Sequence, residues 1–211
     1  MADICKNQGK KVLLVEGKDD CHVVLALCEY YALKEVFGIY QCENDDGILK
    51  RLNALIVKPD PPETIGVIID ADSKGVNNRL QQIKDKISDH KYSFSKNPNP
   101  NGSILQDNKG KPKIGIWIMP DNLNDGLLED FLITMADKKG LQAAAECIEA
   151  VINKGVAAFK NVHKSKAMIH TYLAWQNEPG KPLGQSITAH ALQPKTEIAD
   201  IFIQWLKNLF Y

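Results

Sequence analysis

The sequence predicts an α/β protein with a mostly parallel, four-stranded, Rossmann-like sheet flanked by helices, and with a helical C-terminal extension. The first observation is a set of short apolar runs, which is typical of strands buried on both faces. The second is that segments with apolar residues at helical spacing alternate with these runs, as in βαβ units. The third is that this alternation stops beyond Gly155, where only helical patterns follow.

The N-terminal half contains three of the expected strands, at residues 11–16, 36–42 and 65–69. A helix with an apolar face follows the first strand. The second strand leads into Asn44-Asp45-Asp46, which are N-cap candidates for another helix. A polar helix over about residues 76–88 follows the third strand.

The fourth strand is expected at residues 113–119. Before it, residues 90–112 are rich in Asn, Pro, Gly and Lys, which predicts a long loop or an inserted hairpin with turn residues at 107–110. After it, helical patterns cover residues from 126 onward, about 141–152, about 164–175 and 196–210. The last of these carries an apolar stripe that we expect to pack against the core: Ile198, Ile201, Phe202, Trp205, Leu206 and Leu209. We therefore expect an α/β domain over residues 1–137, with an insertion near 90–112, and a helical extension over 138–211 that packs on it.

Composition limits the classes of protein to which the chain can belong. At 211 residues and 44% hydrophobic content, it can bury a substantial core without disulfides or structural metals. The formal net charge is zero, so global charge indicates no nucleic-acid or membrane partner, although charge can be unevenly distributed. No apolar run approaches the length of a membrane span, so we expect no membrane association. The five cysteines are odd in number, lack C-x-x-C spacing and follow no signal peptide, which favours reduced thiols and a cytoplasmic protein.

Acidic residues follow three of the predicted strands. In chain order they are Glu16 with Asp20, Asp70 with Asp72, and Asp121 with Glu129 in the next helix. Because the carboxyl ends of parallel strands meet at one edge of a sheet, we expect these acids to converge there. Carboxylates brought close together repel one another, which a hard divalent cation relieves, and oxygen ligands without Cys or His suit Mg²⁺ or Mn²⁺. The expected metal ligands are Glu16, Asp20, Asp70, Asp72 and Glu129.

Each of these acids also has a plainer explanation. A single carboxylate just after a strand is often the cap of the helix that follows. We expect Asp19 and Asp130 to be caps or solvated residues of this kind.

Charge is distributed unevenly along the second half of the chain. Residues 121–137 contain five acids and no Lys or Arg, whereas residues 138–181 contain seven Lys, three Glu and the two histidines His163 and His170. An acidic metal pocket beside a basic face would suit a phosphodiester substrate, and a solvated charged face explains the lysines equally well. The same two explanations apply to Lys18 and Lys74, which lie close to the acidic motifs.

Two motifs resemble those of the Toprim domain. Val15-Glu16-Gly17 ends one apolar strand and Ile69-Asp70-Ala71-Asp72 ends another, 54 residues further on. The resemblance covers about residues 10–137. Toprim domains occur in topoisomerases, bacterial primases, recombination-repair proteins and the overcoming-lysogenization-defect nucleases.

Further residues resemble the nuclease branch of this superfamily. Glu16-x-x-x-Asp20 resembles its paired acids, although Asp20 stands where Glu is more usual, and Leu128-Glu129 resembles its late Leu-Glu motif. Residues 119–131 and 172–176 resemble small, stand-alone, Toprim-like prokaryotic proteins. This last resemblance implies a fold rather than an activity.

The resemblance to the nuclease branch implies a metal-dependent nuclease. It implies that Asp70 and Asp72 hold Mg²⁺ with Glu16, assisted by Asp20 and Glu129, and that Glu16 also acts as a general acid or base. The implied catalytic residues are therefore Glu16, Asp70 and Asp72, and the implied substrate is nucleic acid, with DNA favoured over RNA. The nuclease branch usually carries a fused ATPase, and this sequence has no Walker-type phosphate loop, so an ATPase partner would be a separate chain.

Two other functions remain open on the sequence. One is a non-catalytic module that binds nucleic acid or protein and keeps the metal pocket for structure or regulation. The other is a Mg²⁺-dependent phosphatase or phospho-acceptor domain on a similar sheet, since phospho-acceptor domains also carry adjacent acids after their first strand, as Asp19 and Asp20 do here.

Overall fold

The computed structural model describes residue 5, residues 9–106 and residues 110–211. Its centre is a single sheet of five strands in the order β2-β1-β3-β5-β4. The strands are β1 (Lys11–Val15), β2 (Gly38–Gln41), β3 (Thr64–Asp70), β4 (Ser103–Leu105) and β5 (Lys113–Met119). β2, β1, β3 and β5 are parallel to one another, so the predicted α/β class and mostly parallel sheet are confirmed.

The predicted count of four strands is wrong, because β4 forms a fifth strand inside the segment expected to be a loop or a hairpin. β4 pairs antiparallel with β5, with Ile104 opposite Gly115. It is only three residues long and Ile104 is exposed, so it has neither the length nor the alternation that identifies a strand in a sequence. The predicted turn at 107–110 lies mostly outside the described residues, which exclude 107–109.

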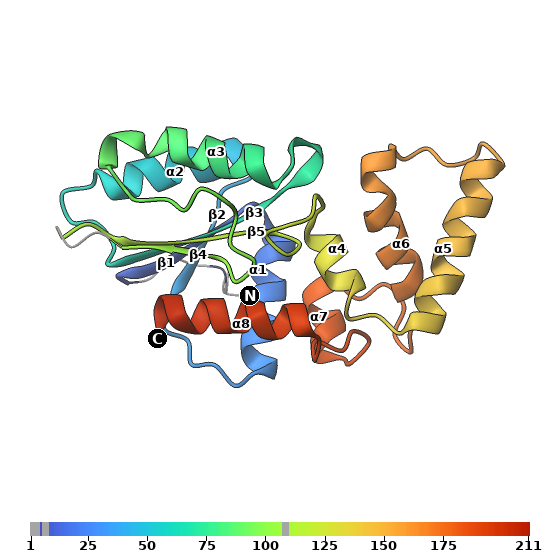
Figure 1. Ribbon diagram of the computed structural model, residues 1–211. Helices are drawn as coiled ribbons and strands as arrows, with labels where there is room; N and C mark the ends of the chain where they lie inside the picture. The colour runs from blue at the N-terminus through green and yellow to red at the C-terminus, as the bar shows by residue number, and fades with distance from the viewer. Residues whose placement is uncertain (1–4, 6–8, 107–109) are drawn as a thin grey trace.

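Helices cover both faces of the sheet and make three layers (Figure 1). α2 (Asp45–Ile56) and α3 (Val76–Lys86) lie on one face, and α1 (Lys18–Tyr30) and α8 (Glu197–Phe210) lie on the other. Along β1, Val12 and Leu14 belong to the hydrophobic cluster under α2 and α3, and Leu13 and Val15 belong to the cluster under α1 and α8. This burial on both faces is why the strand reads as a continuous apolar run.

α8 packs closely against the middle of the sheet because two glycines make room for it. Gly66 of β3 and Gly115 of β5 are direct neighbours in the register. A Cβ atom on Gly115 would lie 2.3 Å from a methyl carbon of Leu209, and one on Gly66 would lie 3.0 Å from the ring of Phe210. Most of the predicted stripe of α8 is buried here, and Ile198 and Ile201 are only partly covered.

The remaining helices extend the molecule beyond the carboxyl edge of the sheet. They are α4 (Leu128–Ile133), α5 (Lys138–Asn153), α6 (Lys164–Leu173) and the short α7 (Leu183–Thr188), which the sequence patterns did not reveal. α5 and α6 form an antiparallel hairpin that projects away from the sheet (Figure 1). The hydroxyl of Tyr172 connects the base of this hairpin to the neighbouring segments, since it accepts a hydrogen bond from the Asp137 N–H (3.2 Å) and donates one to the Ala191 carbonyl (3.0 Å).

The cysteines differ from the expectation of reduced thiols. Cys5 and Cys21 form a disulfide, whereas Cys28, Cys42 and Cys147 are free. The two bonded residues are 16 positions apart, and no local spacing reveals that Cys5 meets Cys21 in the first turn of α1. Among the helices of the described residues, none has the length and apolar character needed to cross a lipid bilayer.

Candidate functional site

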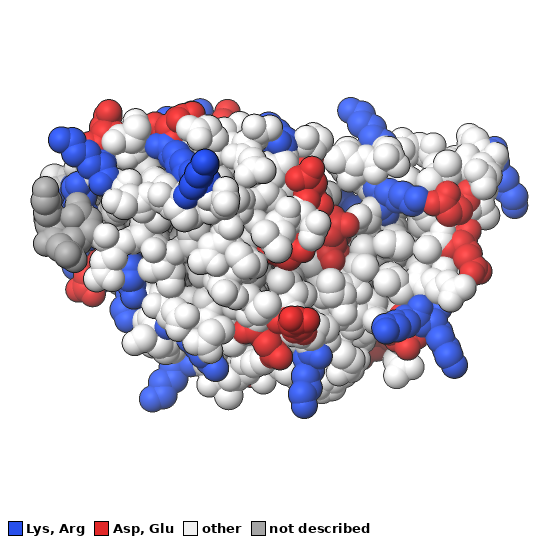
Figure 2. Space-filling view, viewed as in Figure 1, with Lys and Arg blue, Asp and Glu red and all other residues white. Residues whose placement is uncertain are grey.

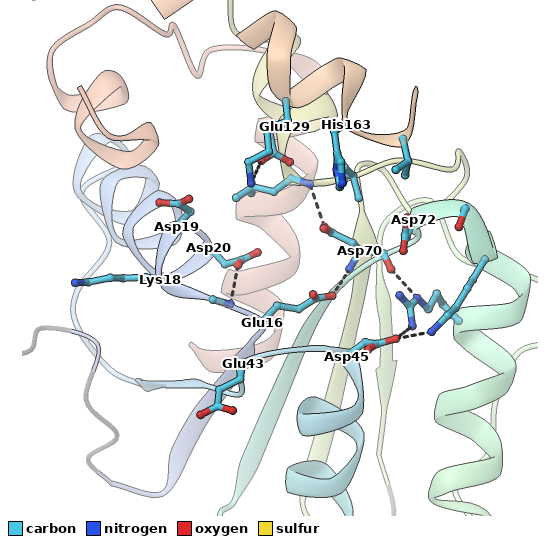
Figure 3. Close-up of a pocket in the computed structure, with 18 residues that line it drawn as sticks. Glu16, Lys18, Asp19, Asp20, Glu43, Asp45, Asp70, Asp72, Glu129 and His163 are labelled. Atoms are coloured by element: carbon cyan, nitrogen blue, oxygen red, sulfur yellow. Dashed lines mark hydrogen bonds and ion pairs between the residues drawn. The ribbon is translucent and has the colours of Figure 1, made fainter. Parts of the chain in front are cut away.

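The predicted site residues line one cavity of about 640 Å³ at the carboxyl edge of the sheet (Figure 3). The ends of β1 and β3 form its floor, and the first turns of α1 and α4 and the segment 72–79 form its walls. Val162, His163 and Lys166 reach it from the α5–α6 hairpin. The expected convergence of the acids Glu16, Asp20, Asp70, Asp72 and Glu129 at this edge is therefore what the structure has.

Asp70 lies at the centre of the carboxylate cluster. It is the last residue of β3, which lies next to β1, so it comes close to Glu16 just after β1. The Asp70 N–H donates to Glu16 Oε1 (3.3 Å), and Asp70 Oδ1 in turn accepts from the N–H of Leu128 (3.0 Å). Adjacent parallel strands and the start of α4 thus fix both carboxylates.

Asp20 lines the cavity beside Glu16 and also caps α1. Its Oδ2 accepts from the Gly17 N–H (2.9 Å), while Asp19 is exposed and points away from the cluster (Figure 3). Of the two roles expected for Asp19, solvation is confirmed and capping is wrong. The helix begins at Lys18, so its third residue, Asp20, is the one whose side chain can reach back to the Gly17 N–H.

Asp72 is held in a left-handed turn. Its φ is +54°, a conformation that Asp tolerates better than most residues, and its N–H donates to the Gly126 carbonyl (2.9 Å). The preceding N–H, of Ala71, donates to the Met119 carbonyl at the end of β5 (3.1 Å). These bonds hold Asp72 at the cavity beside Asp70.

Glu129 lies in the first turn of α4 and is almost completely buried. Its Oε1 forms an ion pair with Lys166 Nζ of α6 at 3.3 Å, so the α5–α6 hairpin is connected to the cluster. Asp130 caps α4 by accepting from the Leu127 N–H (2.8 Å), which confirms the role expected for it. Asp121 is not part of the cavity, because its carboxylate accepts from the nearby Leu123 and Asn124 N–H groups.

Burial and mutual repulsion raise the pKa values of this cluster. Burial, followed by repulsion from Glu16, Asp20 and Glu129, raises the pKa of Asp70 to about 9. Burial, opposed by the bond from the Gly17 N–H, raises the pKa of Asp20 to about 7, and burial also raises the pKa of Glu16. Without a counter-charge, the cluster therefore retains protons at neutral pH.

The donor set suits a hard cation, but its geometry is not that of a complete metal site. Within residue 5 and the ranges 9–106 and 110–211, no three Asp, Glu, His or Cys side chains are arranged to hold a metal ion together. The five predicted ligands share a cavity without sharing one coordination sphere. Mg²⁺ keeps several waters and is often held by one or two carboxylates, and a cation would relieve the repulsion that now raises these pKa values.

One wall of the cavity is formed by charged residues that sequence reasoning did not assign to the site. Asp45, expected only as one of three capping candidates, accepts hydrogen bonds from Arg79 and Lys74, which hold its pKa well below the usual range. The actual cap of α2 is Asn44, which accepts from the Gly47 N–H. Arg79 is 2% exposed, and a lone Arg in a polar helix gives no sequence signal of such burial. Lys18 is exposed and points away from the cluster (Figure 3).

Acidic and basic side chains occupy neighbouring parts of the surface. Figure 2 shows acids gathered near the junction between the sheet and the α5–α6 hairpin, and lysines along the projecting helices. The cavity itself is mixed, because the carboxylates are bordered by Lys74 and Arg79 on one side and by His163 and Lys166 on another.

A family model described as "Protein of unknown function (DUF3226)" matches residues 10–211. The chain belongs to this family. The matched range begins one residue before β1 and includes every residue of the cavity and the whole α5–α6 hairpin, so both are parts of the DUF3226 region. No curated protein and no solved structure matches the sequence significantly.

Proposed function

We propose that this DUF3226 protein is a Toprim-type nuclease that uses Mg²⁺ or Mn²⁺ to cleave phosphodiester bonds in nucleic acid, with DNA favoured over RNA. The observation that carries the proposal is the carboxylate cluster at the carboxyl edge of adjacent parallel strands, with Glu16 just after β1, Asp70 at the end of β3 and Asp72 two residues beyond it. The Toprim assignment rests on those two motifs and on the parallel order β2-β1-β3-β5 that supports them.

In this proposal Asp70 and Asp72 hold the cation with Glu16, while Asp20 and Glu129 complete the acidic surroundings. When bound, the cation would supply a nucleophilic water and stabilise the leaving oxygen. Glu16 is suited to general acid or base work, because burial raises its pKa and the Asp70 N–H fixes its carboxylate. Lys166 neutralises Glu129 and so limits the negative charge that a phosphodiester would meet.

The partner and the location are further parts of the proposal. By the resemblance to the nuclease branch, an ATPase is the proposed protein partner. A cytoplasmic location agrees with three free cysteines, and the Cys5–Cys21 disulfide is the observation that weighs against it. Trapping of thiols in freshly lysed cells would decide whether this pair is reduced in the cell.

The test incubates the purified protein with single- and double-stranded DNA and RNA in the presence of Mg²⁺, Mn²⁺ or a chelator. Metal-dependent cleavage is expected, and Asp70→Ala and Glu16→Gln should abolish it while the circular dichroism spectrum is retained. Asp19→Asn is the matched control, because it removes an exposed acid of the same segment and should leave cleavage unchanged.

A non-catalytic metal-binding module is the second candidate. It is favoured over the nuclease by the use of Asp20 as a helix cap, because this commits to the fold one of the paired acids that the nuclease branch would use for the metal. Tight binding of nucleic acid without cleavage would establish this candidate, and cleavage of a phosphomonoester alone would establish the phosphatase function instead.

A further inference from the structure

Three charged side chains form a network on one wall of the cavity, beside the carboxylate cluster. Asp45 begins α2, Lys74 lies in the 3-10 turn Asp72–Lys74, and Arg79 lies in α3. A single oxygen of Asp45, Oδ2, accepts from both Lys74 Nζ (2.6 Å) and Arg79 Nη1. Two cationic donors are therefore directed at one anionic oxygen within the cavity.

Arg79 links this network to the proposed metal centre. Its Nε donates to the backbone carbonyl of Asp70 (2.8 Å), which fixes the guanidinium directly behind the residue at the centre of the cluster. The side chain of Arg79 is 2% exposed, whereas those of Asp45 and Lys74 are 22% and 45% exposed. Of the two cations, Arg79 is thus buried and fixed, whereas Lys74 and the Asp45 carboxylate between them are accessible.

Arg and Lys donors converging on one oxyanion are a usual means of binding phosphate. We propose that Lys74 and Arg79 form a binding subsite for a backbone phosphate of nucleic acid, and that Asp45 occupies this subsite until the phosphate displaces it. The inference rests on the proposed function, because it places the bound phosphate next to the bond to be cleaved.

The charge balance of the cavity supports this exchange. Asp45 is near enough to Glu16 for the two carboxylates to repel each other. Rotation of Asp45 away from the subsite would leave its place to a phosphodiester, whose two non-bridging oxygens can accept from both donors while its single charge replaces that of Asp45. Asp45 thus acts as an internal competitor of the substrate.

The experiment measures binding in a chelator, so that cleavage does not contribute. A fluorescently labelled single strand and a duplex of DNA are titrated with the wild-type protein, and binding is followed by anisotropy over a range of salt concentrations. Lys74→Ala removes the exposed donor, Asp45→Asn removes the competing charge, and Lys86→Ala, an exposed lysine at the other end of α3, is the matched control. Inorganic phosphate is tested separately by its effect on thermal unfolding.

Lys74→Ala should weaken DNA binding about 5–10-fold and reduce the salt slope by about 1, since one phosphate contact is lost. Asp45→Asn should tighten binding by about 5-fold or more relative to the wild type. The proposal is overturned if Lys74→Ala changes DNA affinity and its salt slope no more than Lys86→Ala does. If Asp45→Asn does not fold, the salt slope of Lys74→Ala by itself tests the proposal. It is also overturned if the wild type binds neither single-stranded nor duplex DNA, whether or not it binds inorganic phosphate.

The outcomes separate this subsite from the proposed nuclease activity. If DNA binds with these variant effects but Mg²⁺ and Mn²⁺ support no cleavage, the proposed function fails and the subsite stands. If DNA is cleaved and Lys74→Ala leaves KM unchanged, the subsite fails and the proposed function stands.

Discussion

Replacing Asp70 with Asn should stabilise the metal-free protein, and more so at higher pH. Asn keeps the size of the side chain and the oxygen that accepts from the Leu128 N–H, but it cannot ionise, so the unfolded chain no longer gains stability by releasing a proton at this position. Asp70 has a pKa of about 9 in the fold, raised by burial and then by its acidic neighbours, against about 4 in an unfolded chain. A gain in stability from replacing a buried carboxyl group is the usual sign of a side chain kept for function rather than for folding.

The sign follows from proton linkage. Between pH 4 and pH 9, the unfolded chain has released the proton of Asp70 while the folded chain retains it, so the free energy of unfolding falls by about 1.4 kcal/mol per pH unit. This contribution is fully present below about pH 4 and is lost as the pH rises toward 9. Between about pH 4 and pH 8 the loss is at most about 5 kcal/mol, and water in the open cavity screens the charges, so we expect Asp70→Asn to gain about 2–4 kcal/mol at pH 8.

Urea denaturation in a chelator at several pH values measures this gain. The free energy of unfolding of Asp70→Asn and of the wild type should agree near pH 4 and diverge as the pH rises. Asp19→Asn, which alters an exposed acid of the same cavity rim, should stay within about 0.5 kcal/mol of the wild type throughout. A gain that does not grow with pH, or a loss at pH 8, would refute the assignment of Asp70 to a desolvated carboxylate cluster.

Three further predictions concern cation binding and packing. Binding of Mg²⁺ or Mn²⁺ at pH 7 should release about one to two protons, since the raised pKa values of Asp70 and Asp20 leave protons on the metal-free cluster at that pH. Titration calorimetry in buffers of different ionisation enthalpy counts these protons, and equal enthalpies in all buffers would contradict the prediction. Gly115→Ala should lower the free energy of unfolding by about 1–3 kcal/mol, because its methyl group would overlap Leu209. Urea denaturation should show a smaller loss when the same change is made in a Leu209→Ala background, and an equal loss in both backgrounds would argue against this contact. Tyr172→Phe should lower the free energy of unfolding by about 1–3 kcal/mol, because the Asp137 N–H and the Ala191 carbonyl both lose a hydrogen-bond partner. Amide hydrogen exchange should then become faster at the base of the α5–α6 hairpin, and unchanged exchange there would exclude this anchoring role.

The elements and residues that could be predicted from the sequence are those with a periodic or local signal. β1, β3 and β5 follow from continuous apolar runs, and the convergence of Glu16, Asp70 and Asp72 follows from their position after parallel strands. β4 and α7 were missed because three and six residues are too few to establish a period.

The misassigned site residues depend on tertiary structure or on a single position. Asp20 takes the capping role expected for Asp19, in addition to lining the cavity, because which acid caps the helix depends on the single residue at which the helix begins. The local sequence pattern predicts that Arg79 and Asp45 are solvated. Only the tertiary packing of α3 buries the Arg79 guanidinium, which lies between Asp45 and the end of β3. The pairing of Cys5 with Cys21 likewise depends on tertiary structure and not on a local pattern.

The position of α8 has a consequence for how the molecule is made. This helix follows every strand in the chain, yet Leu209 and Phe210 cover Gly66 and Gly115 at the middle of the sheet. During synthesis at about 5–20 residues per second, β3 waits several seconds or more, exposed on one face, until residues 197–210 have left the ribosome. The nascent chain is therefore expected to need protection from aggregation during that interval.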